Sequence, residues 1–131
     1  MSIVVPVGRG DRFNPILRRG ITLAQNHDTS LVVLFSCVLD ECSQDEIDTN
    51  VDLITDELEQ VDIAFDIVTR LDGVDLATQI RETALAHDAS LIIISLAPKP
   101  SHGSYQLGSQ IQKLLVDAPC ELLIMRDAVS E

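Results

Sequence analysis

The chain has 131 residues, the length of one ordinary domain, and 46% of them are hydrophobic. Only four residues are aromatic, so the core must be built from Val, Ile, Leu and Ala. The formal net charge of −12 excludes the basic surface that nucleic-acid binding requires. No apolar run approaches the length of about 18 residues that a membrane span needs. Because the N-terminus also has no export pattern, we expect one soluble, cytoplasmic domain over residues 1–131.

The negative charge is unevenly distributed along the chain. Residues 1–27 carry a net charge of +3, and the remaining 104 residues carry −15. Between Arg19 and Arg70 there are twelve acidic residues and no Lys or Arg. Such repulsion destabilises a compact chain unless salt screens it. The composition therefore predicts a halophilic host, with an acidic mesophilic protein as the alternative.

The cysteines are few and their number is odd. Cys37, Cys42 and Cys120 include no CxxC pair. The set predicts a reduced compartment, with neither a disulfide framework nor a zinc site. Cys37 and Cys120 adjoin apolar runs, so we expect them to pack in the core.

The first part of the chain alternates strand and helix patterns. Residues 3–7 form a short β-rich run. Asn14 and Pro15 fit the N-cap and the first position of a helix that ends near His27. Its buried face comprises Leu17, Gly20, Ile21 and Ala24. Residues 31–38 then form a nearly continuous apolar run, typical of a strand buried on both faces.

A capping box marks the second helix. Ser43 and Glu46 have the spacing that satisfies free amides at a helix start. The buried stripe of this helix comprises Ile47, Val51, Ile54 and Leu58. Its outer face carries Asp45, Asp48, Asp52, Asp56 and Glu59, which we interpret as a solvated surface. Residues 61–67 alternate apolar and polar, which predicts a half-exposed strand whose Asp62 and Asp66 protect a sheet edge.

The second half repeats the alternation. After an Asp72-Gly73 turn, residues 76–87 predict a helix, and residues 91–94 predict a buried strand. The expected buried face of this helix comprises Leu76, Ala77, Ile80 and Ala84. A loop rich in Pro, Ser and Gly is expected over residues 95–107. Ser109 and Gln112 form a second capping box, which starts a short helix before Pro119, and residues 122–125 predict the last strand.

These elements predict a single doubly wound α/β domain. Five strands joined through four helices must run parallel, with right-handed crossovers. Ligands of such folds bind beyond the carboxyl ends of the strands, at the point where the strand order reverses.

The sequence predicts no catalytic residue and no metal ligand. It contains no GxSxG, Walker A or GxGxxG motif. His27 and His87 lie near predicted helix C-termini, where imidazole suits the helix dipole. His102 has no Cys or Asp at ligand spacing.

The closing segment carries a family resemblance. Gly108-Ser109 opens a helix that runs on to Cys120 and a short apolar strand. This segment and the opening residues 3–7 resemble the universal stress protein family, in element order over nearly the whole chain. The resemblance implies strand order 3-2-1-4-5 and a stress-related binding or regulatory role. It also implies a homodimer through the last strand, at Leu122, Leu123, Ile124 and Met125.

The resemblance also implies a nucleotide site, but the motif is incomplete. ATP-binding members carry a glycine, two residues, a second glycine, nine residues, then Gly-Ser or Gly-Thr. Gly108-Ser109 matches the end, whereas Ser95 and Pro98 replace the two glycines and Gly8 replaces an aspartate after strand one. Because proline lacks an N–H and Ser95 adds a side chain, we expect no tight ATP binding. The residues expected to line the site are Val7, Gly8, Arg9, Val38, Ser95, Pro98, Gly108, Ser109 and Gln110.

Several alternatives stay open at this point. Arg9 and Arg12 follow strand one and favour phosphate or carboxylate, so they either compensate for the lost glycines, bind a different anion or balance nearby acids. ATP and AMP are the candidate ligands, and no cofactor is assigned. The alternative functions are an ATP-binding switch or weak ATPase and a regulatory domain for a transporter, and an unknown protein partner is compatible with each.

Overall fold

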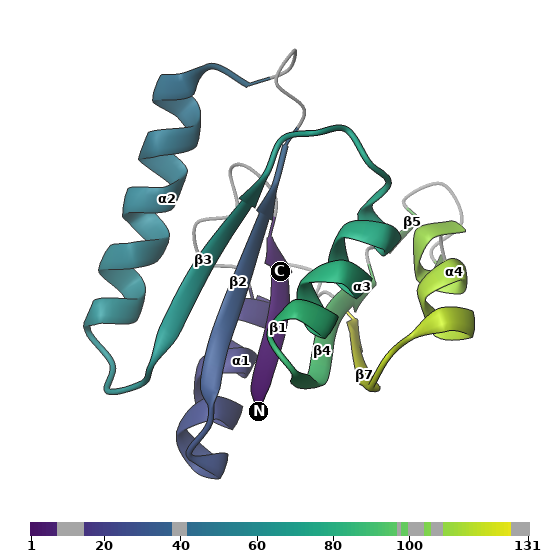
Figure 1. The fold of residues 1–131 in the computed structure, drawn as a ribbon, viewed down its shortest axis with the longest axis horizontal. Helices are drawn as coiled ribbons and strands as arrows, with labels where there is room; N and C mark the ends of the chain where they lie inside the picture. Colours follow the sequence, from purple (N-terminus) through teal and green to yellow (C-terminus); the bar gives the residue numbers. More distant parts are fainter. Residues whose placement is uncertain (8–14, 38–41, 97, 100–103, 106–108, 127–131) are drawn as a thin grey trace.

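The fold is an open parallel sheet with helices on both faces (Figure 1). The computed structural model describes residues 1–7, 15–37, 42–96, 98–99, 104–105 and 109–126. Their elements are β1 (Ser2–Val7), α1 (Pro15–His27), β2 (Ser30–Ser36), α2 (Gln44–Glu59), β3 (Phe65–Arg70), α3 (Leu76–Ala86), β4 (Ala89–Leu96), β5 (Pro98–Lys99), β6 (Ser104–Tyr105), α4 (Ser109–Asp117) and β7 (Glu121–Arg126). The sheet order is β3-β2-β1-β4-β7, which confirms the predicted topology of five parallel strands and four helices.

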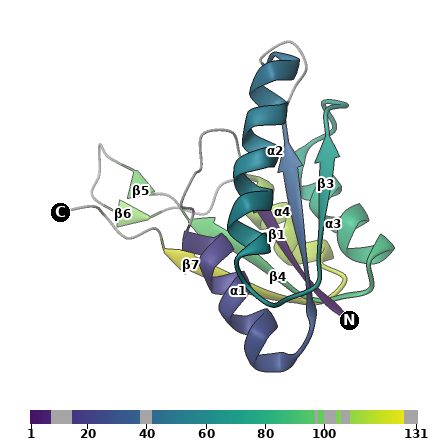
Figure 2. The same cartoon turned by 90° about the vertical axis from the view of Figure 1, so that its left-hand side faces the viewer.

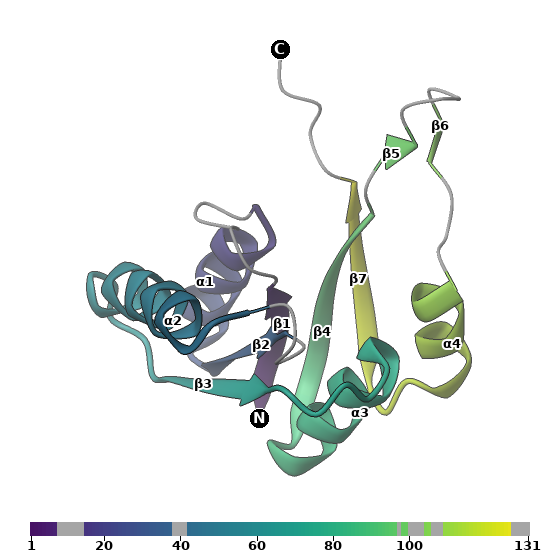
Figure 3. The same cartoon turned by 90° about the horizontal axis from the view of Figure 1, so that it is seen from above.

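Two aliphatic cores lie on the two faces of the sheet. Successive side chains of a strand point to opposite faces, so each central strand contributes to both cores. One core packs α1 and α2 against Val5 and Val33, and the other packs α3 and α4 against Val4 and Val32. Figure 3 shows this division, with α1 and α2 on one side of the sheet and α3 and α4 on the other. The central strands β1 and β2 are thus covered on both faces, as their continuous apolar sequences predict.

Gly20 allows α1 to lie close to the sheet. Of the predicted face of this helix, Leu17, Gly20 and Ala24 are buried, and Ile21 is partly buried against the same core. A Cβ atom on Gly20 would lie 2.7 Å from Cγ2 of Val5 and 2.9 Å from Cδ1 of Leu31. Both neighbours are fully buried, so a larger residue at position 20 would force the core to shift.

The second helix begins where the capping box predicts. Ser43 is the N-cap of α2, and its Oγ accepts a hydrogen bond from the Glu46 N–H at 3.1 Å. The predicted solvated face is confirmed, because its five acidic residues are all exposed: Asp45, Asp48, Asp52, Asp56 and Glu59. Of the expected stripe, Ile47, Ile54 and Leu58 are buried, and Val51 is partly buried against the same core.

Strand β3 begins later than the alternation predicts. The expected start at Val61 is wrong, because pairing with β2 begins only at Phe65, opposite Leu31. The Val61 N–H instead donates to the Leu58 carbonyl at 3.2 Å, which closes the end of α2 and keeps this backbone out of the sheet. β3 is an edge strand, as predicted, and Asp66 is exposed on it.

The buried face of α3 is rotated relative to the prediction. Leu76 was expected in the core, but its side chain is 39% exposed. Asp75 is the N-cap and accepts from the Thr78 N–H at 3.3 Å, which makes Leu76 the first helical residue. The buried residues are Ala77, Gln79, Ile80, Thr83 and Ala84. Where the Asp72-Gly73 turn was predicted, the chain bends at Asp72, and Gly73 has a φ of 73°, which suits glycine.

Part of the expected loop after β4 forms a small hairpin. β4 extends to Leu96, two residues beyond the predicted strand. Pro98 and Lys99 then pair antiparallel with Tyr105 and Ser104. Figures 2 and 3 show this β5–β6 hairpin projecting beyond the ends of β4 and β7. The prediction of a continuous loop over residues 95–107 is therefore wrong for these residues.

The structure corrects the prediction for two of the cysteines. Cys37 and Cys42 form a disulfide, and their Cα atoms lie 6.6 Å apart. The sequence spacing predicted no disulfide, but the end of β2 and the start of α2 lie close enough to bring the two residues together. Both are buried in the core on the α1 side, so the expected packing of Cys37 is confirmed. Cys120 is half-buried and packs against the other core.

The helices of the described residues are short. α2, the longest of them, has 16 residues and is acidic. None of the helices in the described ranges is long and apolar enough to cross a membrane.

Candidate functional site

The strand order reverses between β1 and β4, in the middle of the sheet. β1 lies between β2 and β4, so the chain proceeds from β1 toward one edge and from β4 toward the other. The connections after β1 and β4 lead to α1 and α4, which cover opposite faces. In doubly wound folds, ligands bind between such diverging connections. In the described part of the chain, this edge is marked by Val7 and Leu96, the last residues of β1 and β4.

Three of the predicted site residues lie at or near this edge on strands. Val7 is the last residue of β1, but its side chain is 5% exposed and packs in the core. A ligand could therefore meet Val7 only through its backbone. Ser95 lies in β4 opposite Met125, and Pro98 lies in β5. The other predicted positions on the connections, Gly8, Arg9, Arg12, Val38 and Gly108, lie outside the described residues.

Ser109 and Gln110 begin the last helix at the same edge. A helix that joins two parallel strands runs antiparallel to them, so α4 starts at the carboxyl edge. Ser109 is its first residue and is exposed. The Gln110 Oε1 accepts a hydrogen bond from the Ala77 N–H at 2.9 Å. The side chain of Gln110 thus fastens α4 to the start of α3.

The N-terminus of α3 is occupied by the protein's own side chains. Asp75 accepts from the Thr78 N–H, and Lys113 of α4 lies 3.0 Å from Oδ2 of Asp75. The hydrogen bond from Lys113, followed by that from Thr78, lowers the pKa of Asp75 below its ordinary value of 3.8, so this carboxylate is ionised at neutral pH. An anion would have to displace Asp75 or Gln110 to reach the α3 amides. Ser109, at the start of α4, is exposed.

A polar network that the sequence analysis missed joins the ends of β2 and β3 to α3. The Ser36 Oγ donates to Gln79 Oε1 at 2.5 Å, and Gln79 Nε2 donates to Asp72 at 3.1 Å. Arg70 completes the network through Asp72 at 2.7 Å and Glu82 at 3.1 Å. Gln79 is only 2% exposed. The sequence held one signal of this network, because the polar Gln79 directly precedes the core residue Ile80.

The polar side chains of this network are bonded to one another. The hydrogen bond from Arg70 is the main cause that lowers the pKa of Asp72 below its ordinary value. An ionised carboxylate held in this way is a poor general base, because it is stabilised in its charged form. The network therefore ties the carboxyl ends of β2 and β3 to α3.

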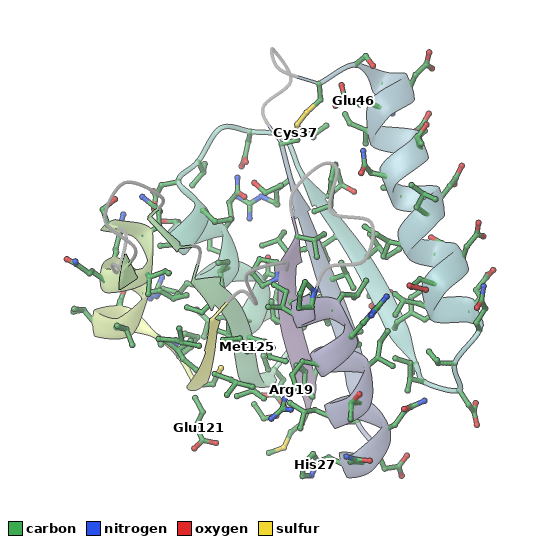
Figure 4. The ribbon with its side chains drawn as sticks, turned by 180° about the vertical axis from the view of Figure 1, so that it is seen from behind. Arg19, His27, Cys37, Glu46, Glu121 and Met125 are labelled. Atoms are coloured by element: carbon green, nitrogen blue, oxygen red, sulfur yellow. A yellow bond between two sulfur atoms is a disulfide. The ribbon has the colours of Figure 1, made fainter. Side chains whose placement is uncertain are left out.

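A surface depression of about 1030 Å³ lies at the opposite, amino end of the sheet. Its lining includes His27, Asp28, Asp62 and Glu121. Figure 4 shows His27 and Glu121 at the end of the molecule away from Cys37. Three carboxylates would repel a phosphate group, so this depression does not suit a nucleotide.

The topology defines a doubly wound α/β protein whose strand order reverses between β1 and β4. The model of the universal stress protein family matches residues 1–126. The chain belongs to this family. No curated protein sequence matches the chain.

Solved structures show the same fold. A universal stress protein from Archaeoglobus fulgidus is 21% identical, with a TM-score of 0.71, and the match covers 95% of this chain and 97% of that one. The Archaeoglobus fulgidus protein in complex with dAMP is 20% identical, with a TM-score of 0.66 and coverage of 95% and 96%. A family member from Arabidopsis thaliana with AMP bound is 12% identical, with a TM-score of 0.62 and coverage of 100% and 94%.

Proposed function

We propose that this protein is a stress-related regulatory module that binds adenine nucleotides weakly at the carboxyl edge of its sheet. The observation that carries the proposal is the reversal of the strand order between β1 and β4, with the start of α4 and Ser109 at the carboxyl edge of the sheet. Family members of the same fold are described with dAMP or AMP bound, which supports an adenine nucleotide as the ligand class.

Weak binding follows from the residues at the phosphate positions. Phosphates are held in such sites by closely approaching backbone N–H groups and helix N-termini. Pro98 has no N–H to donate, and the backbone of Ser95 belongs to the β4–β7 pairing, opposite Met125. A hydrogen bond to a charged group contributes about 1.5–3 kcal/mol, so two lost contacts would lower affinity on the order of a hundredfold or more.

Regulation rather than catalysis is the proposed role. Two described acids near the edge, Asp72 and Asp75, are each held by a basic side chain. Neither pair has the free base that nucleotide hydrolysis requires to activate water. This arrangement supports a module that signals through binding, in a compartment that the composition predicts to be the cytoplasm.

Titration calorimetry with ATP and with AMP tests the proposal. We expect no binding of ATP by the natural chain below the millimolar range at moderate salt. The triple variant Gly8→Asp, Ser95→Gly, Pro98→Gly restores the family's residues at the three departing positions. We expect it to bind ATP about a hundredfold more tightly. The reason is that the backbone N–H groups at positions 95 and 98 could then donate to the phosphates of ATP.

The matched control is Pro100→Gly, which makes the same chemical change in the same segment but outside the motif spacing. It should leave the affinity unchanged. Micromolar binding of ATP by the natural chain would contradict the proposed weakness. A triple variant that binds no better than Pro100→Gly would contradict the assignment of the phosphate positions.

We also propose that the active form is a homodimer joined through β7. This strand lies at the edge of the sheet and pairs only with β4 among the described strands. Its four central residues are all apolar and half-buried: Leu122, Leu123, Ile124 and Met125. An apolar edge with free backbone groups favours pairing with another strand. Antiparallel pairing with a second copy would cover it.

A further inference from the structure

Cys37 and Cys42 are the two cysteines that the fold brings together. Cys37 follows the last residue of β2, and Cys42 precedes Ser43, the N-cap of α2. The side chains are 9% and 7% exposed, and the Cα separation of 6.6 Å lies within the range of protein disulfides. Figure 4 shows the bond between the sheet and the start of α2, where Glu46 is also labelled.

The bond connects two well-anchored pieces of backbone. The Cys37 N–H donates to the Arg70 carbonyl at 3.0 Å, which continues the β2–β3 pairing. On the other side, Ser43 caps α2, and Ile47 in the first turns of this helix is buried against the core. Closing the bond therefore fastens the start of α2 to the end of β2.

The third cysteine, Cys120, lies apart from this pair. Cys120 precedes β7 and packs against the core on the opposite face of the sheet. Burial, followed by the charge of Glu121, raises the pKa of the Cys120 thiol. Because Cys120 lies on the opposite face of the sheet from the other two cysteines, it serves as the internal reference.

We propose that Cys37 and Cys42 form a reversible redox pair that fastens or releases the start of α2 according to the surrounding thiol–disulfide balance. In a reducing compartment, disulfides of this kind are usually transient or redox-sensing. The inference does not depend on nucleotide binding. It assigns the chain a way to respond to oxidants that is separate from the ligand edge.

The chemistry needs only a small disulfide such as oxidised glutathione. One cysteine thiolate attacks the glutathione disulfide, which forms a mixed disulfide and releases one glutathione thiolate. The second cysteine thiolate then attacks the protein sulfur of the mixed disulfide and releases the second glutathione. The two cysteines lose two electrons and two protons, and the glutathione disulfide gains them. Excess reduced glutathione or dithiothreitol reverses both steps.

The test uses the full chain equilibrated in oxidised and in reduced glutathione. Free thiols are alkylated with iodoacetamide and counted by intact mass, and hydrogen exchange is followed in both states. We expect one alkylated thiol in the oxidised state and three in the reduced state. Amides of residues 44–50 should exchange about tenfold faster, or more, after reduction, because the short tether has been lost. Amides of α3 should not change.

Two variants define the pair. Cys120→Ser should keep the redox response, and Cys42→Ser should exchange like the reduced protein in either buffer. Three alkylated thiols under oxidising conditions would overturn the proposal, and so would equal exchange of residues 44–50 in the two states. Both of these measurements are made on the natural chain, so they decide the question even where a variant fails to fold.

Discussion

Raising the KCl concentration from 0.1 M to 1 M is expected to raise the melting temperature of this protein by at least several degrees. The exposed face of α2 carries five acidic residues at spacings of three and four, with no basic residue between Arg19 and Arg70. Each like-charged neighbour at such a spacing costs about 0.2–0.5 kcal/mol, so the face alone costs about 1–2 kcal/mol. Salt at 1 M shortens the screening length to about 3 Å and removes most of this cost.

Salt also weakens the attractive pairs, but these contribute less. The ion pairs of the described residues, such as Arg81–Asp117 at 3.1 Å and Lys113–Asp75 at 3.0 Å, are largely exposed. Exposed pairs of this kind contribute about 0–1 kcal/mol each. Because the chain carries −12 overall, repulsion outweighs them.

The melting curve can be measured by circular dichroism at both salt concentrations. For a chain of this length, 1 kcal/mol corresponds to about 3–6 °C. The double variant Asp52→Asn, Asp56→Asn removes two exposed charges from α2 and should melt higher than the natural chain at low salt, with a smaller gain at 1 M. A melting temperature that does not change with KCl would contradict the halophilic interpretation.

Replacing Ile124 with Lys is expected to convert the proposed dimer to a monomer or to an aggregate. Ile124 lies in the middle of β7, half-buried against the core of α3 and α4. A charge there disfavours an apolar strand pair at the edge of the sheet. Light scattering of the natural chain should give the mass of two copies, and the variant should not.

The control for this variant lies on the other edge of the sheet. Ile67 of β3 is also half-buried, and β3 is also an edge strand. Ile67→Lys should lower the melting temperature in the same way but leave the dimer intact. If Ile124→Lys remains a dimer of unchanged mass, β7 is not the interface.

The sequence correctly predicted those elements that depend only on the residue pattern within one segment. The apolar runs of β1 and β2, the stripe of α1 and the Ser43 cap of α2 each depend on spacing within one element, and the structure confirms them. The predictions were less accurate for elements whose first or last residue depends on contacts with a neighbouring element. β3 begins at Phe65 because the preceding backbone closes α2, a competition that the alternating pattern of residues 61–67 did not reveal.

The candidate site was predicted only in outline, for a similar reason. The switch point follows from the strand order, and the family resemblance identified the positions expected to line it. The role of Gln110 required its partner Ala77, which is 33 residues away in the sequence. The burial of Gln79 likewise depends on Ser36 and Asp72 from other elements. Such pairings form only when the chain is folded, so spacing within one segment does not reveal them.

Native mass spectrometry of the purified chain tests the central claim most directly. The protein is purified without added nucleotide and transferred to ammonium acetate, and its mass is compared with that of the chain alone. A module that binds adenine nucleotides only weakly loses them during purification, so the account predicts the mass of two copies of the polypeptide without any addition. A stoichiometric addition of the mass of AMP or ATP to each copy would contradict it.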